Sequence, residues 1–257
     1  MFANKPANKT VVSLSGGMDS TGLLMHLLAQ DCEVFGISFN YGQKHILELD
    51  RLEANIAYLK TQDIHVHHDS VDLSILGKLY SSALTDPDWK IPEGHYEQDN
   101  MKQTVVPNRN AIFASIAYGY ALSIAIKNNE QVSIALGVHS GDHAIYPDCR
   151  PEFYEAIHKA FAVGNWDSEK VDLYLPYIDG DKHTILKDAE ASIAKVGLDF
   201  DTIFKNTNTS YEPDEFGRAS GKTGADIERI EAFIKLGRKD PVTYQKSWED
   251  LTKSNEA

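Results

Sequence analysis

Cysteine and positive charge are both scarce in this sequence. Cys32 and Cys149 are the only cysteines among 257 residues, too few for a framework of disulfides. The 25 lysines and arginines are outnumbered by 38 acidic residues, which gives a net charge of −13. Non-specific binding to nucleic acid or to an anionic membrane requires basic patches, so we expect neither as a partner.

Long apolar runs and a secretion signal are also missing. No apolar run approaches the length that spans a bilayer, and the first ten residues lack the apolar core of a signal peptide. These absences predict a cytoplasmic location. The remaining composition, 42% hydrophobic and 25% charged, is typical of a globular protein with one α/β domain, alone or with an appendage.

Apolar, strand-like segments alternate with segments of helical spacing along most of the chain. We expect strands at 10–14, 33–39, 63–73, 132–138 and 171–178, and helices at 18–30, 45–60, 108–127, 151–162, 184–196 and 221–237. This alternation predicts a doubly wound, Rossmann-like α/β fold with helices on both faces of a parallel sheet. Residues 78–104 lack any period, which is typical of a functional loop or lid. We expect the ordered part to end with the helix at 221–237.

The first expected strand leads directly into Ser-Leu-Ser-Gly-Gly-Met-Asp-Ser-Thr at 13–21. Gly16 and Gly17 can adopt unusual dihedrals and expose backbone N–H groups, and the start of the following helix favours an anion. Asp19 could cap that helix or help to hold Mg²⁺, and an ordinary Gly-Gly turn is the alternative. The expected nucleotide-binding residues are Leu14, Ser15, Gly16, Gly17, Met18, Asp19, Ser20 and Thr21.

A second glycine-rich stretch, Gly-Arg-Ala-Ser-Gly-Lys-Thr-Gly at 217–224, does not predict a phosphate site. A P-loop needs four residues between its glycines and a preceding apolar strand. Here only three residues separate Gly217 from Gly221, and the preceding residues are polar. We expect a solvated loop before a helix.

Several motifs resemble those of a known family. The stretch Ser-Gly-Gly-Met-Asp-Ser resembles the signature of the PP-loop ATP pyrophosphatases, which bind ATP on this loop and release pyrophosphate. The further stretches are FNYGQKHILEL at 39–49, SSALTD at 81–86, VPNRN at 106–110 and YPDCRPEF at 146–153. Together they resemble the QueC family of 7-cyano-7-deazaguanine synthases, from about residue 11 to residue 244. The resemblance implies an α/β domain of the adenine nucleotide alpha hydrolase type at 1–200 and a small C-terminal helical appendage at 201–257.

The resemblance also implies a reaction, its cofactors and its partners. QueC enzymes use ATP and Mg²⁺ to adenylate 7-carboxy-7-deazaguanine, and ammonia then displaces AMP. A second ATP activates the amide, which loses water to give the nitrile. The family tends to be homodimeric, so we expect a homodimer.

The resemblance and the side-chain chemistry together select the expected site residues. Arginine is a planar cation that suits a carboxylate or a phosphate, although each one could instead form a surface salt bridge. The expected catalytic residues are Asp19, Arg109, Arg150 and Lys182, of which Lys182 matches a family lysine that contacts phosphate and could otherwise be solvated. The expected substrate-binding residues are Tyr41, Gln43, Lys44, Asn110, Asp142, Tyr146 and Asp148, with His45 as a candidate proton shuttle. Asp142 and Asp148 could accept from a guanine-like edge, or could be capping and turn residues.

The C-terminal region departs from the family pattern. In the QueC family four cysteines of this region bind structural zinc, and here their positions are occupied by Ser210, Ser220, Thr223 and Asp226. Hydroxyl groups are poor zinc ligands, and one carboxylate cannot replace four thiolates. We therefore expect no structural zinc, and salt links or an oligomer contact would have to hold residues 205–226.

This departure leaves two other functions open. A QueC-like paralogue could activate the same carboxylate and transfer it to an amine of a partner protein, as QueC-like proteins of antiphage defence operons suggest. The chain could also be a non-catalytic nucleotide-binding scaffold, which would bind ATP and release no pyrophosphate. The sequence leaves the ligase and these alternatives open.

Overall fold

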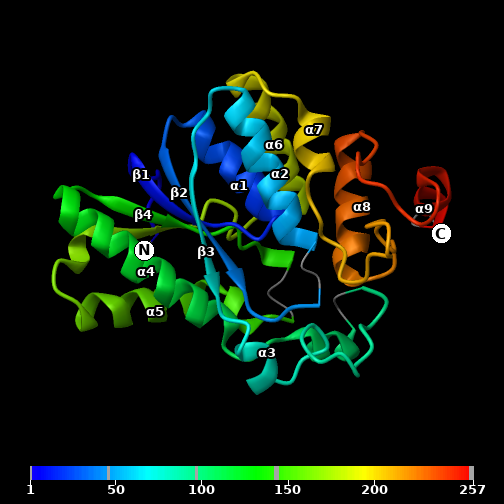
Figure 1. The fold of residues 1–257 in the computed structure, drawn as a ribbon, viewed down its shortest axis with the longest axis horizontal. Coiled ribbons are helices and arrows are strands. Elements are labelled where there is room, and N and C mark those ends of the chain that lie inside the picture. The colour runs from blue at the N-terminus through cyan, green and yellow to red at the C-terminus, as the bar shows by residue number, and fades with distance from the viewer. Residues whose placement is uncertain (1, 45–46, 96–97, 142–144, 255–257) are drawn as a thin grey trace.

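The structure is a computed structural model that describes residues 2–44, 47–95, 98–141 and 145–254. Its centre is a five-stranded sheet in the order β3-β2-β1-β4-β5, and every neighbouring pair is parallel (Figure 1). The strands are β1 (Lys9–Ser13), β2 (Glu33–Asn40), β3 (His67–Asp72), β4 (Val132–Ala135) and β5 (Val171–Tyr174). The predicted doubly wound parallel sheet is confirmed.

Helices cover both faces of this sheet (Figure 1). One face carries α1 (Met18–Ala29), α2 (Leu47–Thr61), α6 (Lys182–Val196), α7 (Phe200–Lys205) and α8 (Gly224–Leu236), and the other carries α4 (Arg109–Asn128) and α5 (Pro151–Gly164). Adjacent strand residues point to opposite faces, so Val12 joins the core under α1 and α6 while Val11 joins the core under α4. Both faces are therefore buried, as a parallel sheet requires.

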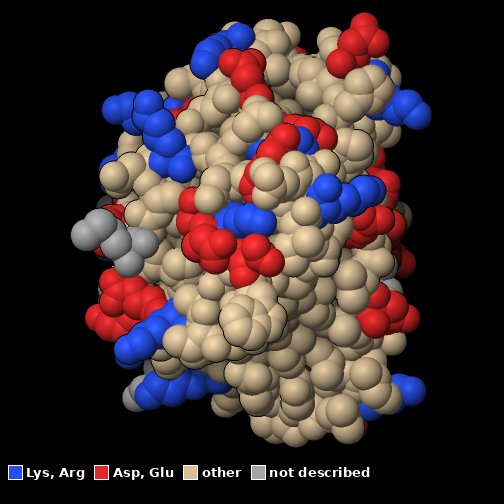
Figure 2. Space-filling view, turned by 90° about the vertical axis from the view of Figure 1, so that its left-hand side faces the viewer, with Lys and Arg blue, Asp and Glu red and all other residues tan. Residues whose placement is uncertain are grey.

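Helix α4 is long and apolar enough, by length and composition alone, to cross a membrane. The expectation that no apolar run approaches the length of a membrane span is corrected for this helix. A core helix can have the same composition, and α4 buries Ala117, Tyr118, Ala121 and Leu122 against the sheet. On the face drawn in Figure 2, lysines and arginines of the described residues lie scattered among acidic side chains instead of forming one basic area.

The irregular segment between β3 and α4 lies along the edge of the sheet where the strands end, below α8 in Figure 1. It contains the short helix α3 (Leu76–Leu79) and a 3-10 turn at Asp99–Thr104. The segment contacts the chain on both sides: Leu84 accepts from the Lys44 N–H at 3.0 Å, and the Gly94 N–H donates to Lys222 at 3.0 Å. The predicted long loop is thus fixed beside the carboxyl edge of the sheet.

Two expectations about where regular structure ends are wrong. Strands β4 and β5 stop at Ala135 and Tyr174, because the chain leaves the sheet at its carboxyl edge. Ordered structure also continues past α8 into α9 (Trp248–Ser254), whose Leu251 is buried against Tyr244 and the loop at 217–224. That loop is correspondingly buried at Ser220 and Thr223 and is not solvated as predicted.

Candidate active site

A cleft opens where β1, β2 and β4 end, which is where α/β sheets bind their ligands. It has a volume of about 250 Å³ and adjoins a hollow of about 130 Å³. The two share the lining residues Ser15, Asp19, Glu48, Arg109, Cys149 and Tyr211. They therefore form one continuous candidate site around the start of α1.

The glycine-rich loop has the geometry of a strand-to-helix anion site. Gly16 has φ +81°, and a Cβ there would lie 1.9 Å from the backbone oxygen of Glu48, so no larger residue fits. Gly17 is the N-cap of α1, and the Ser15 hydroxyl accepts from its N–H at 3.2 Å. The Ser20 hydroxyl accepts from the Ser15 N–H, also at 3.2 Å. The loop is thereby fixed at the mouth of α1.

Asp19 in the first turn of α1 does not cap the helix, because no side chain makes a cap hydrogen bond there. Its Oδ2 instead accepts from the Lys182 ammonium at 2.9 Å. The same ammonium lies 2.9 Å from His139 Nε2 and 3.4 Å from a carboxylate oxygen of Glu228. Lys182 is only 7% exposed. Lys182 is therefore not a solvated lysine at a helix start, which was the alternative interpretation of its place in the sequence.

The ionisation of Asp19 follows from these neighbours. Burial alone would raise its pKa, but the Lys182 ammonium and the hydrogen bond with His139 hold the pKa well below its ordinary value of 3.8. Its second oxygen, Oδ1, is buried and has no hydrogen-bond partner among the described residues. An ionised carboxylate with one oxygen available fits a Mg²⁺ ion that accompanies ATP, and Asp19 is the residue that would hold it.

Arg109, at the start of α4, forms the opposite wall. Its guanidinium donates to the Tyr41 hydroxyl at 3.4 Å and to the Asn110 side chain at 3.4 Å, and lies 5.7 Å from the centre of the Tyr41 ring. Asn110 in turn donates to the Cys149 sulfur at 3.5 Å. Arg109 lines both hollows, so it is available to an anion in the cleft and is not a surface ion pair.

Gln43 and Tyr146 shape the site from neighbouring loops. The Gln43 side chain is buried and accepts from the Tyr41 N–H at 2.9 Å, so it fixes the loop that follows β2. The Tyr146 hydroxyl lies 2.6 Å from the Thr104 hydroxyl, which links the site to the long irregular segment. Stacked rings of Phe39 and Phe113, 4.1 Å apart, give the cleft an apolar wall.

The structure does not bring every predicted residue to the cleft. Lys44 donates to the Trp89 carbonyl at 2.6 Å, and Arg150 is exposed at the start of α5. The predicted residues that line neither hollow are Gly16, Thr21, Lys44, Asp148 and Arg150. Asp142 and His45 lie outside the described residues. For all of these, the functional role stays a prediction.

Glu48, His139 and Glu228 are among the residues of the site that the sequence reasoning missed. Glu48 lines both hollows, and burial raises its pKa to about 8 despite the lowering effect of Arg109. It lies inside the family-like stretch 39–49, and a carboxylate in such a stretch could have been singled out. His139 and Glu228, in contrast, reach Lys182 only through the fold, and no sequence spacing indicates this.

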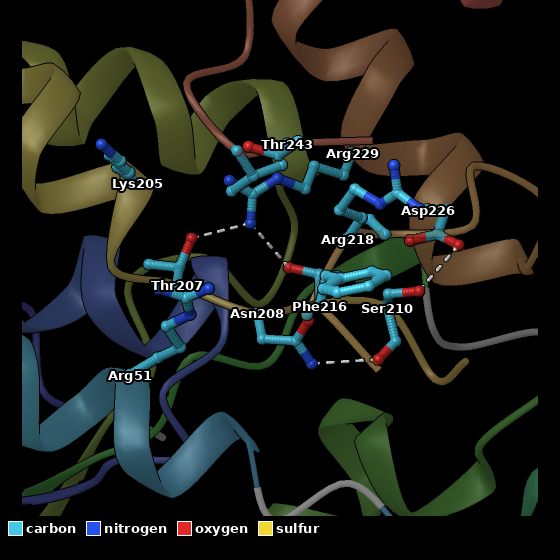
Figure 3. A pocket seen from close by; sticks show the side chains of 14 residues that line it. Arg51, Lys205, Thr207, Asn208, Ser210, Phe216, Arg218, Asp226, Arg229 and Thr243 are labelled. Atoms are coloured by element: carbon cyan, nitrogen blue, oxygen red, sulfur yellow. Dashed lines mark hydrogen bonds between the residues drawn. The ribbon is translucent and has the colours of Figure 1, made fainter. Parts of the chain in front are cut away.

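The four positions of the family zinc cysteines come together in space, and Figure 3 shows two of them, Ser210 and Asp226, joined by a hydrogen bond. Asp226 is fully buried, and its Oδ2 accepts from the hydroxyls of Ser220 at 2.7 Å and Ser210 at 3.1 Å. The same oxygen accepts from backbone N–H groups of residues 221–223 at 3.1–3.4 Å. Thr223 caps α8 by accepting from the Asp226 N–H at 3.3 Å. We call these four residues (Ser210, Ser220, Thr223 and Asp226) the Asp226 cluster. Its donors form hydrogen bonds to one carboxylate, so the cluster does not fit a zinc ion.

A buried salt link stabilises the same region. Arg229 donates to both oxygens of Asp240, at 2.6 and 2.9 Å, and the two side chains are 2% and 0% exposed. Its remaining N–H groups donate to Thr207, Thr209 and the Phe204 carbonyl. All five guanidinium donors are satisfied, so a salt link, one of the two expected means of holding residues 205–226, is present.

Comparison with known proteins agrees with this geometry. The family described as "Queuosine biosynthesis protein QueC" matches residues 9–237. The 7-cyano-7-deazaguanine synthase of Psychromonas ingrahamii is 41% identical over 93% of this chain and 99% of its own length. The 7-cyano-7-deazaguanine synthase 1 of Colwellia psychrerythraea is 43% identical over 93% of this chain and 100% of its own length. A solved NMN synthetase from Francisella tularensis is a remote likeness, with a TM-score of 0.39 and 12% identity over 98% of this chain and 85% of that one. The family match and the extent of the identity show that the chain belongs to the QueC family.

Proposed function

We propose that this protein is an ATP-dependent synthase that converts 7-carboxy-7-deazaguanine and ammonia, through the amide, into 7-cyano-7-deazaguanine. The observation that carries this proposal is the partly buried, ionised Asp19, which Lys182 holds at the start of α1 in a cleft walled by Arg109. The relatives that bear the name of this synthase are matched along almost their full length.

The proposed first step requires two anions to meet. A carboxylate is a poor electrophile because oxide would have to leave, whereas its adenylate loses AMP. The loop at 15–17 and Lys182 would bind the ATP phosphates, and Arg109 would orient the substrate carboxylate for attack on the α-phosphate. A Mg²⁺ ion held by Asp19 would offset the phosphate charge when bound.

The next steps use the same site twice. Ammonia attacks the acyl carbon and AMP leaves with the C–O bond, which gives the amide. A second ATP activates the amide oxygen, and loss of AMP and a proton leaves the nitrile. The rings of Phe39 and Phe113 offer a flat apolar surface on which a deazaguanine ring could lie. We further expect a cytoplasmic homodimer, as the family tendency suggests.

A partner-protein amine is the second candidate acceptor. The observation that favours it is the Asp226 cluster, which replaces the cysteine positions near the adenylation residues and so alters the family pattern in that region. In this alternative the adenylate forms as proposed, and AMP is displaced by a protein amine. Both candidate reactions begin with the same activation step, and a scaffold without catalysis would lack that step.

The activation step is tested by measuring pyrophosphate release from ATP and Mg²⁺ with 7-carboxy-7-deazaguanine and ammonium. We expect Lys182→Met to lower kcat/KM roughly 100-fold or more, since it removes a cation that acts on the phosphates. Lys187→Met, an exposed lysine on the same helix α6, is the matched control and should stay near wild type. Equal activity of both variants would place the nucleotide site elsewhere.

A further inference from the structure

The Lys182 ammonium is held from three separate parts of the chain. Asp19 comes from α1, His139 follows β4, and Glu228 lies in α8 of the C-terminal region. His139 is 1% exposed, and Glu228 is 22% exposed at its side chain. An ammonium at the end of a flexible side chain is thus confined by two carboxylates and an imidazole.

The His139 ring and the Glu228 carboxylate also lie beside the same residue, Gly141. His139 Nε2 lies 2.9 Å from the ammonium and 3.7 Å from Asp19 Oδ2, so the imidazole is packed against both members of the ion pair. A Cβ built at Gly141 would lie 3.0 Å from the His139 ring and 3.5 Å from Glu228. His139, Gly141 and Glu228 therefore form one continuous packed wall behind Lys182.

Glu228 owes its position to the beginning of α8. It lies two residues after Asp226, whose carboxylate collects the hydrogen bonds of the Asp226 cluster. Thr223 caps the same helix, and Figure 3 shows Asp226 at this end of α8. The cluster fixes the first turn of α8, and Glu228 directly follows that turn and reaches the Lys182 ammonium.

We propose that Glu228 and His139 are positioning residues that aim the Lys182 ammonium at Asp19 and at the phosphates bound beside it. Through Glu228 the C-terminal region, which also lines the site with Tyr211, then acts on the adenylation step. This inference rests on the proposed function of Lys182 as a phosphate contact. It assigns to α8 a role in catalysis that goes beyond stability.

The sign of the effect separates positioning from charge. Removing a carboxylate near an ATP site should by itself strengthen ATP binding, because less negative charge repels the phosphates. If Glu228 positions Lys182, its removal should do the opposite. Glu231 is the matched comparison, since it lies on the same helix, is exposed, and lines the hollow beside Lys182.

The experiment compares Glu228→Gln with Glu231→Gln in the full chain. Calorimetry gives the Kd of Mg-ATP, and pyrophosphate release with the deazaguanine acid and ammonium gives kcat. For Glu228→Gln we expect a Kd roughly threefold higher and a kcat roughly tenfold lower than wild type, with an unchanged melting temperature. Glu231→Gln should give an unchanged or lower Kd and a kcat within about twofold of wild type.

A third variant separates reach from charge. Glu228→Asp keeps the charge and shortens the side chain, so positioning predicts a lower kcat, whereas a role of charge alone predicts wild-type behaviour. The inference is overturned if Glu228→Gln behaves like Glu231→Gln while wild type is active. If wild type releases no pyrophosphate, the proposed function has failed, and the Mg-ATP affinities alone decide whether Glu228 positions Lys182.

Discussion

Asp19 and Glu48 are two partly buried carboxyl groups that line one cleft, and their pKa values shift in opposite directions. Burial raises both, but Lys182 and His139 outweigh it at Asp19, whose pKa falls well below its ordinary value. Glu48 has only Arg109 to oppose burial, and its pKa rises to about 8. At neutral pH and without ligand, the cleft therefore holds one ionised carboxylate and one largely protonated carboxyl group.

Glu48 makes stability depend on pH in a defined direction. Between pH 4.5 and about 8 the folded chain binds more protons at Glu48 than the unfolded chain does, so the free energy of unfolding falls as pH rises. Urea denaturation without ATP at pH 5 and pH 8 measures this fall. In Glu48→Gln we expect the fall to be smaller by roughly 2–3 kcal/mol.

The control for this prediction is Glu231→Gln, an exposed glutamate of α8. It should keep the wild-type dependence of stability on pH. An identical fall in wild type and Glu48→Gln would show that Glu48 is not protonated in the folded chain near neutral pH.

At the scale of single elements, the beginning of α8 is the part that differs most from the family expectation. One carboxylate, that of Asp226, accepts from two hydroxyls and three backbone N–H groups. These hydrogen bonds link the loop at 217–224 to the helix. The buried pair of Arg229 and Asp240 stabilises the next turn.

Stability of this element should therefore depend on Asp226 and not on a metal. We expect EDTA to leave the melting temperature of wild type unchanged. Asp226→Ala leaves several buried donors without an acceptor and should lower the free energy of unfolding by roughly 3–5 kcal/mol, measured by urea denaturation. Zinc bound in a one-to-one ratio, or a fall in melting temperature with EDTA, would contradict this.

Helices and strands were predictable wherever their apolar spacing was regular. The alternation of strand-like and helix-like segments predicted the parallel sheet. Consecutive strand residues such as Val11 and Val12 are both apolar because one is buried on each face of the sheet. The prediction failed where tertiary contacts decide. Helix α9 and the buried loop at 217–224 depend on each other through Leu251 and Gly221, which are distant in sequence.

For the molecule as a whole, local sequence predicted the nucleotide loop and not the groups that complete the site. Asp19 follows a strand and a glycine pair, so its place at an anion site is a local property. Glu228 meets Lys182 because α6 and α8 pack side by side, and His139 reaches it from the chain that follows β4. A homodimer and a separate unit at 201–257 stay predictions.

The measurement that tests the account most directly follows nitrogen into the product. The protein is incubated with ATP, Mg²⁺, ¹⁵N-ammonium and 7-carboxy-7-deazaguanine, and mass spectrometry reads both the small molecules and the intact protein. The account predicts 7-cyano-7-deazaguanine that carries ¹⁵N, with one AMP for each activation step. Unchanged ATP and acid, or a deazaguanine attached to protein in place of the labelled nitrile, would contradict it.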